Sequence, residues 1–181
     1  AKKDIRIDAA SVMEATDALR DVQNYYNEID RPHVVISLLT SSAKSPTGKL
    51  LMCASNTFLF PDAHGKEPRV IHEMWDNNMH LMKFGRTLKA GETYRFSIAG
   101  SSITSAHHDD PLNEAERLTI YAKLEGRDRL LQFHEQAWAE LWKGDIEIEG
   151  DEVSQKDVRS MLYHLYSFSR AGTALSPSPM G

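Results

Sequence analysis

The chain has 181 residues, of which 41% are hydrophobic and 26% are charged, and its formal net charge at pH 7 is −5. This length fits one large domain or one domain with an appendage, and the hydrophobic fraction is enough for a packed core. The negative charge without a Lys/Arg cluster excludes nucleic acid as the main partner, and no apolar run of about 18 residues is present to span a membrane.

The single cysteine, Cys53, lies in an apolar segment and cannot form an internal disulfide. We interpret it as a small buried hydrophobic residue, which leaves the cellular compartment open. The opening residues, Ala-Lys-Lys-Asp, do not lead into the apolar core of a signal peptide. We therefore expect a soluble chain without a targeting segment in this sequence.

Short runs rich in β-branched and apolar residues predict a ladder of strands in the first 104 residues. The expected strands cover residues 4–8, 33–40, 49–60, 69–75, 78–84 and 92–99. A turn at residues 89–92 is expected to join the last two as a hairpin. Propensity alone predicts a helix over residues 9–27, and strand and loop are assigned there only on the resemblance given below. The ladder indicates an antiparallel β-sandwich.

From residue 105 onward the hydrophobic period changes to that of helices. Asp110 is expected to cap the first helix, with Pro111 in its first turn. The expected helices cover residues 112–124, 128–143 and 152–170, and residues 171–181 form a tail or truncated loop. The sequence thus predicts an α+β chain with a complete or incomplete β-sandwich at 1–104, a helical region at 105–170 and a tail or truncated loop at 171–181.

The stretch from residue 134 to residue 159 joins the last two helices through a short acidic connector. Gly144 is expected to end the first of them by taking a positive φ, and Asp151 to cap the second. Residues 145–149 alternate acid and isoleucine, which predicts a short half-buried strand. The apolar faces of the two helices consist of Leu130, Leu131, His134, Ala137, Trp138, Leu141 and Trp142, and of Val158, Met161, Leu162, Leu165 and Phe168. Either these faces pack on a domain outside this sequence, or they cover the sheet of a complete α+β domain.

A spaced motif runs through this connector and both flanking helices. It consists of His134, Trp138, Trp142, Asp145, Ile146, Ile148, Gly150, Asp151, Gln155, Arg159, His164 and Leu165. The motif resembles the linker of glycoside hydrolase family 65, which includes maltose, trehalose and kojibiose phosphorylases and related hydrolases. Gly91-Glu92-Thr93 and Thr104-Ser105 also resemble the family's sandwich, whereas Ala106-His107 depart from its loop pattern.

The resemblance implies a β-sandwich of the galactose-mutarotase type, joined by linker helices to an (α/α)6 barrel. In the family the acid glutamate and the phosphate site lie in the barrel, so no catalytic residue is expected here and this chain alone is expected to be non-catalytic. The parent enzyme is expected to cleave an α-glucosidic bond of a disaccharide with inversion, by phosphorolysis or hydrolysis. The implied partners are the barrel of the same polypeptide, an oligosaccharide or disaccharide substrate, and a second copy in a homodimer. The implied structural linker residues are His134, Trp138, Trp142, Asp145, Asp151, Gln155 and Arg159.

Two groups of polar residues are candidates for catalysis or for metal binding. Glu147 and Glu149 would lie about 7 Å apart on a strand face, which fits an inverting carboxylate pair, but we interpret them as a solvated face. Residues 107–110, His-His-Asp-Asp, offer metal ligands, but adjacent residues rarely converge on one ion. We therefore expect no metal and no cofactor.

Trp75, flanked by His72 and His80, is the candidate for stacking on a sugar. Trp138 and Trp142 share a helix face with leucines, so we interpret them as packing residues. Two further interpretations stay open. One is a stand-alone carbohydrate-binding sandwich with Trp75 as its platform, and the other is an interaction domain whose aromatic helix faces bind a partner protein.

Overall fold

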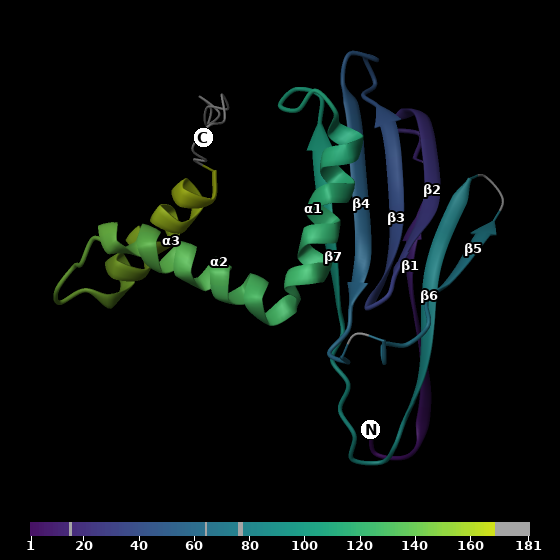
Figure 1. Cartoon of the computed structure of the whole chain (residues 1–181). Helices are drawn as coiled ribbons and strands as arrows, with labels where there is room; N and C mark the ends of the chain where they lie inside the picture. The colour runs from purple at the N-terminus through teal and green to yellow at the C-terminus, as the bar shows by residue number, and fades with distance from the viewer. Residues whose placement is uncertain (15, 64, 76–77, 169–181) are drawn as a thin grey trace. The chain divides into compact units, whose positions relative to one another are not determined.

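The computed structural model describes residues 1–14, 16–63, 65–75 and 78–168. Internal contacts divide the chain into two compact units, Ala1–Leu130 and Leu131–Gly181. The elements in chain order are β1 (Ile5–Met13), β2 (Arg20–Arg31), β3 (Val34–Lys44), β4 (Leu51–Leu59), β5 (Ile71–Trp75), β6 (Met79–Leu88), β7 (Ser97–Thr104), α1 (Pro111–Glu125), α2 (Arg127–Leu141), the 3-10 turn η1 (Trp142–Gly144) and α3 (Glu152–Phe168) (Figure 1).

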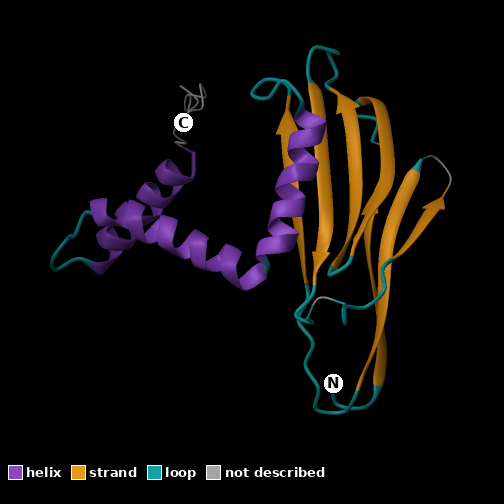
Figure 2. Cartoon of the chain, in the orientation of Figure 1, coloured by secondary structure: helices purple, strands orange, loops and turns teal. Residues whose placement is uncertain are grey.

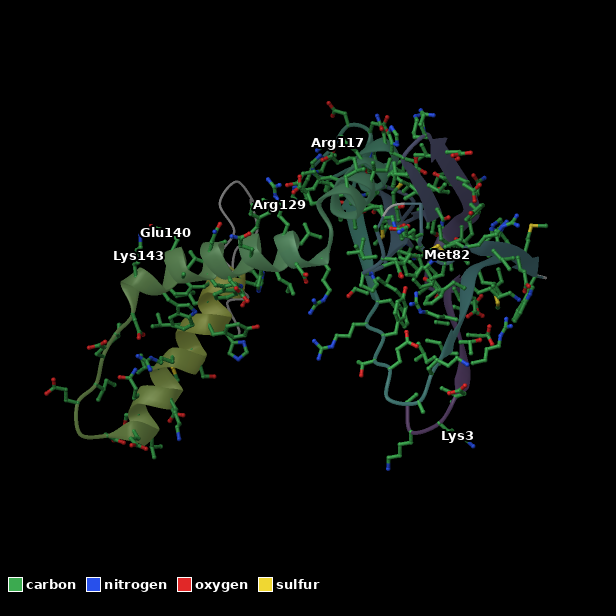
Figure 3. The ribbon with its side chains drawn as sticks, turned by 60° about the horizontal axis from the view of Figure 1, so that its bottom comes forward. Lys3, Met82, Arg117, Arg129, Glu140 and Lys143 are labelled. Carbon is green, nitrogen blue, oxygen red and sulfur yellow. The ribbon has the colours of Figure 1, made fainter. Side chains whose placement is uncertain are left out.

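The first unit is built on two antiparallel sheets, which confirms the predicted α+β sandwich. One sheet has the order β1-β6-β5 and the other the order β2-β3-β4-β7. The core lies between them, where Leu39 and Phe58 of the four-stranded sheet meet Met82 and Phe84 of the three-stranded sheet (Figure 3). Cys53 is buried, as predicted. These aromatic and aliphatic contacts hold the two sheets face to face.

Residues 9–13 and 20–27 form strands despite the helical propensity of the segment. β1 pairs with β6 along its whole length, from Ile5 opposite Leu88 to Met13 opposite His80. β2 pairs with β3, so that tertiary pairing decides the conformation of the segment.

The predicted hairpin at residues 89–92 is wrong, because the strands on either side of it belong to different sheets. A turn does form there, with the Glu92 amide donating to the Lys89 carbonyl at 3.0 Å. The chain then crosses from β6 to the other sheet, and Tyr94 and Phe96 pack against the core on the way. The last strand consequently covers Ser97–Thr104 instead of residues 92–99.

α1 lies along the four-stranded sheet, over β4 and β7 (Figure 1). Asp110 caps it as predicted, accepting from the Asn113 amide at 3.1 Å. The contact is unusually polar, since Ser101 donates to the Ala115 carbonyl at 2.6 Å and Thr119 donates to the Ser55 carbonyl at 3.2 Å. This helix therefore lies in the same compact unit as the strands. The predicted division of the sequence at residue 104 stays a prediction.

The second unit contains most of α2, the turn η1, the connector and α3 (Figure 2). The last two predicted helices are present within one to two residues of their expected ends in the described range. The tail predicted at residues 171–181 lies outside the described residues. None of the helices described is both long enough and apolar enough to cross a membrane.

Candidate functional site

Aromatic rings join α2 and η1 to α3 in the second unit. Trp138 stacks on Tyr163 with ring centroids 5.2 Å apart, and Trp142 meets Tyr166 edge to face at 5.7 Å. Trp138 also stacks on Trp142 at 6.3 Å, and His134 lies edge-on to Trp138 at 6.1 Å. The structure thus brings the three predicted linker residues of the first helix together. The two tryptophan rings pack on Tyr163 and Tyr166 of α3, as offset and edge-on aromatic pairs do in protein cores.

Gly144 ends this helix for a reason other than the predicted one. The corner between α2 and α3 consists of η1 and the connector at residues 145–151. Within it Gly150 has a positive φ, of 84°, and Gly144 does not. A Cβ atom added at Gly144 would lie only 3.2 Å from the Tyr166 hydroxyl oxygen. That hydroxyl donates to the Gly144 carbonyl at 3.3 Å. Glycine is therefore needed here because Tyr166 approaches the backbone closely.

The connector at residues 145–149 does not form the predicted strand. Its amides have no neighbouring strand to pair with, and the side chain of Gln155 on α3 takes that place. The Ile148 amide donates to Gln155 Oε1 at 2.6 Å, and Gln155 Nε2 donates to the Ile146 carbonyl at 2.9 Å. A side-chain amide offers the same donor and acceptor as a peptide group, so it satisfies an extended segment as a strand partner would.

Asp145 and Arg159 form an ion pair that closes the corner. Arg159 Nε and Nη2 both donate to Asp145 Oδ2, at 2.9 and 2.6 Å. Asp145 Oδ1 accepts from the Ile146 amide at 2.9 Å. The hydrogen bond from Arg159 holds the pKa of Asp145 below its usual value, and the carboxylate raises the pKa of Arg159 in return. The pair ties the start of the connector to the middle of α3.

Asp151 caps α3, as predicted. Its Oδ1 accepts from the amides of Val153 and Ser154 at 3.0 and 3.1 Å, and its Oδ2 accepts from the Ser154 hydroxyl at 2.7 Å. The bond from that hydroxyl is the main cause of the lowered pKa of Asp151. Glu147 and Glu149 are exposed in the connector. The seven predicted linker residues thus lie in two groups, His134, Trp138 and Trp142 among the aromatic contacts and Asp145, Asp151, Gln155 and Arg159 around the connector. Their role as the linker of a larger enzyme stays a prediction.

The predicted buried stripe of α3 is only partly buried. Val158 and Leu162 are half-buried, whereas Met161, Leu165 and Phe168 are exposed. No residue of α2 or of α3 as described reaches full burial. These side chains are exposed because two packed helices cover only one stripe on each other's surface, whereas α3 has two apolar stripes.

Trp75 lies at the end of β5, at the edge of the three-stranded sheet, and is 57% exposed. The structure brings its two flanking histidines together on β5 and β6, with His72 Nε2 3.2 Å from His80 Nδ1. Tyr26 stacks on His72, a contact that sequence reasoning missed because the two residues come from different sheets. Among the described residues, no group of three or more His, Cys, Asp or Glu side chains is arranged to hold a metal ion.

The described residues thus form an antiparallel sandwich that is followed in the chain by helices, and side chains of tryptophan, aspartate, glutamine and arginine fix the last two helices and their connector.

No protein-family model matches the chain. The kojibiose hydrolase of Mucilaginibacter mallensis is 67% identical over 181 residues, which is 100% of this chain and 27% of that protein. The kojibiose hydrolase of Flavobacterium johnsoniae is 52% identical over 180 residues, or 99% of this chain and 26% of that protein. The nigerose phosphorylase of Lachnoclostridium phytofermentans is 30% identical over 95 residues, or 51% of this chain and 13% of that protein.

These relatives confirm the resemblance drawn from the linker motif. The chain spans about a quarter of the length of the two kojibiose hydrolases that it matches from end to end.

Proposed function

We propose that this chain is the β-sandwich and linker of a longer enzyme that cleaves α-glucosidic bonds of disaccharides, and that it does not catalyse the reaction alone. The observation that carries the proposal is the pattern of coverage. Two kojibiose hydrolases match almost every residue of the chain, while the chain accounts for only 27% and 26% of their lengths.

The exposed stripe of α3 supports this role. Val153, Met161 and Leu165 are spaced at multiples of four residues, so they share one helix face, and they are 69%, 70% and 51% exposed. Burying such side chains stabilises a fold by about 25 cal/mol for each Å² of apolar surface removed from water. We infer that this face packs on the remainder of the polypeptide, and that the corner residues hold α3 in position for it.

Kojibiose is the proposed substrate of the longer enzyme, and hydrolysis is the proposed reaction. The matches to the two hydrolases are both longer and closer than the match to the phosphorylase. Water would then take the position that phosphate occupies in phosphorolysis.

The test is a product assay on the longer product of the reading frame beside residues 1–181 alone. With kojibiose, the longer protein is expected to release glucose at the same rate with and without phosphate, and residues 1–181 to release none. Formation of glucose 1-phosphate when phosphate is added would show that the reaction is phosphorolysis and not hydrolysis. A reading frame that ends at Gly181 would overturn the proposal.

A second candidate function, sugar binding by the sandwich itself, rests on the exposed ring of Trp75. An exposed aromatic face can stack on a sugar ring. Calorimetric titration of the chain with kojibiose, beside a Trp75→Ala variant, tests it: heat of binding that is lost in the variant supports this role, and no heat in either protein removes it. The predicted homodimer stays a prediction, and sedimentation velocity of the longer protein tests it.

A further inference from the structure

Three aromatic residues from three strands meet at one edge of the sandwich. His72 on β5 and His80 on β6 lie within hydrogen-bonding distance, at 3.2 Å between Nε2 and Nδ1. Tyr26 of β2 lies flat on His72, with centroids 4.4 Å apart and ring planes within 3° of parallel. His80 is buried and His72 half-buried. The cluster therefore spans both sheets and is largely removed from water.

The cluster links β5 to the four-stranded sheet. It is a five-residue edge strand whose ladder partner is β6 alone. None of its residues is fully buried, and Ile71, Met74 and Trp75 are exposed. Short edge strands with few buried contacts are the first parts of a fold to open. The stack of Tyr26 on His72 links this strand to the opposite sheet.

The acidic groups found near the pair already have partners of their own. On β2 the Tyr26 hydroxyl donates to Glu28 Oε2 at 2.8 Å, and its oxygen lies 3.1 Å from the Ser37 hydroxyl of β3, which can donate to it. On β5 itself, Glu73 pairs with Lys83 of β6, both in register positions that alternate with those of the histidines. On β1, the residue opposite His80 is Met13, which is uncharged.

Two imidazoles in contact can share a proton, but they cannot both be cations. A neutral ring accepts at one nitrogen, whereas a protonated ring has only donors. With one proton added, the pair keeps its hydrogen bond. With two, neither ring can accept, and two like charges face each other in a partly buried site.

We propose that His72 and His80 form an acid-sensitive latch that holds β5 on the sandwich at neutral pH and releases it when both rings are protonated. Burial, and secondarily the charge of His80, lower the pKa of His72. A histidine whose pKa is lowered by folding stabilises the fold above its unfolded value of about 6.5, and that stabilisation is lost as the pH falls below it.

The test is hydrogen–deuterium exchange of the β5 peptide in the longer protein, expressed as protection factors at pH 7.5 and pH 5. The wild type is expected to lose about tenfold in protection at pH 5, because a strand released from the opposite sheet opens more often. His72→Phe keeps a ring to stack on Tyr26 but cannot be protonated, so its β5 protection is expected to stay within about threefold between the two pH values.

His107→Gln, in the exposed loop before α1, is the matched control and is expected to behave as the wild type. If His72→Phe does not fold, His80→Gln replaces it, because that variant also prevents a doubly protonated pair. Equal protection of wild-type β5 at both pH values would overturn the proposal, and so would an undiminished acid loss in the folded variant.

Discussion

Arg159 places two of its nitrogens on a single oxygen of Asp145, at 2.9 and 2.6 Å, across 14 residues of sequence. This pair closes a loop that contains the whole connector between η1 and α3. Inside the loop, Gln155 holds the two isoleucine peptide groups and Asp151 caps the helix. The corner is therefore fixed by side chains of α3, without any strand pairing.

Replacement of Gln155 tests whether its amide substitutes for a strand partner. Gln155→Leu removes both hydrogen bonds to the connector and is expected to lower the free energy of unfolding of the second unit by about 1–2 kcal/mol. Gln155→Glu keeps an acceptor for the Ile148 amide but loses the donor to the Ile146 carbonyl, so it is expected to cost less at pH 7. Urea unfolding followed by far-UV circular dichroism measures both. Equal costs for the two variants would mean that the Ile148 bond contributes nothing.

The ion pair of Asp145 makes the corner weaker in acid. Because Arg159 lowers the pKa of Asp145 in the folded state, the pair stabilises the fold above the unfolded pKa of about 3.9. That contribution is lost as the pH falls through the still lower folded pKa. Asp145→Asn is therefore expected to be less stable than the wild type at pH 6 and to approach it near pH 2. Chemical unfolding at a series of pH values checks this, and a difference that does not depend on pH would contradict it.

A double-mutant cycle tests the close approach at Gly144. Gly144→Ala places a methyl group 3.2 Å from the Tyr166 hydroxyl oxygen and is expected to cost about 1–2 kcal/mol. In a Tyr166→Phe background the hydroxyl is absent, so the same substitution should cost less than half as much. Thermal unfolding of the four proteins gives the coupling energy. Identical costs in both backgrounds would show that backbone conformation, and not space, selects glycine here.

In the first unit, Lys123 on α1 carries a buried charge. Its side chain is 4% exposed, and Nζ lies 2.7 and 2.9 Å from the two Glu67 carboxylate oxygens and 3.1 Å from the Phe58 carbonyl. Lys123→Met removes the ammonium group that pairs with the Glu67 carboxylate in a largely buried site. The substitution is expected to lower the free energy of unfolding by about 3 kcal/mol. The pair Lys123→Met and Glu67→Gln should recover part of that loss in urea unfolding. A double variant no more stable than Lys123→Met would contradict this account of the ion pair.

The corner could be predicted from the sequence because its residues are near one another in the chain. Helical spacing places Trp138 and Trp142 on one face, and Asp151 precedes α3 as a capping residue does. The alternation at residues 145–149 predicts a strand, which the structure does not form. It does not reveal that the partner is one side chain, Gln155, because alternation is the same whatever satisfies the backbone.

The contacts that the sequence did not reveal join residues far apart in the chain. His72 meets Tyr26 across the two sheets, and Arg86 on β6 meets Asp62 at 2.8 Å beneath the ring of Tyr94. Their existence depends on which strands share a sheet, and local patterns do not specify that. The same limit explains the shifted β7, since the crossing of residues 89–96 between sheets is a feature of topology.

The most direct test of the central claim is the amide protection of α3, residues 152–168, in residues 1–181 alone and in the longer product of the reading frame. If the exposed stripe of Val153, Met161 and Leu165 packs on the remainder of the enzyme, peptides from this helix will be at least about tenfold better protected in the longer protein, as buried helices are relative to exposed ones. Equal protection in the two proteins would contradict the claim that this chain serves as a linker packed on a further domain.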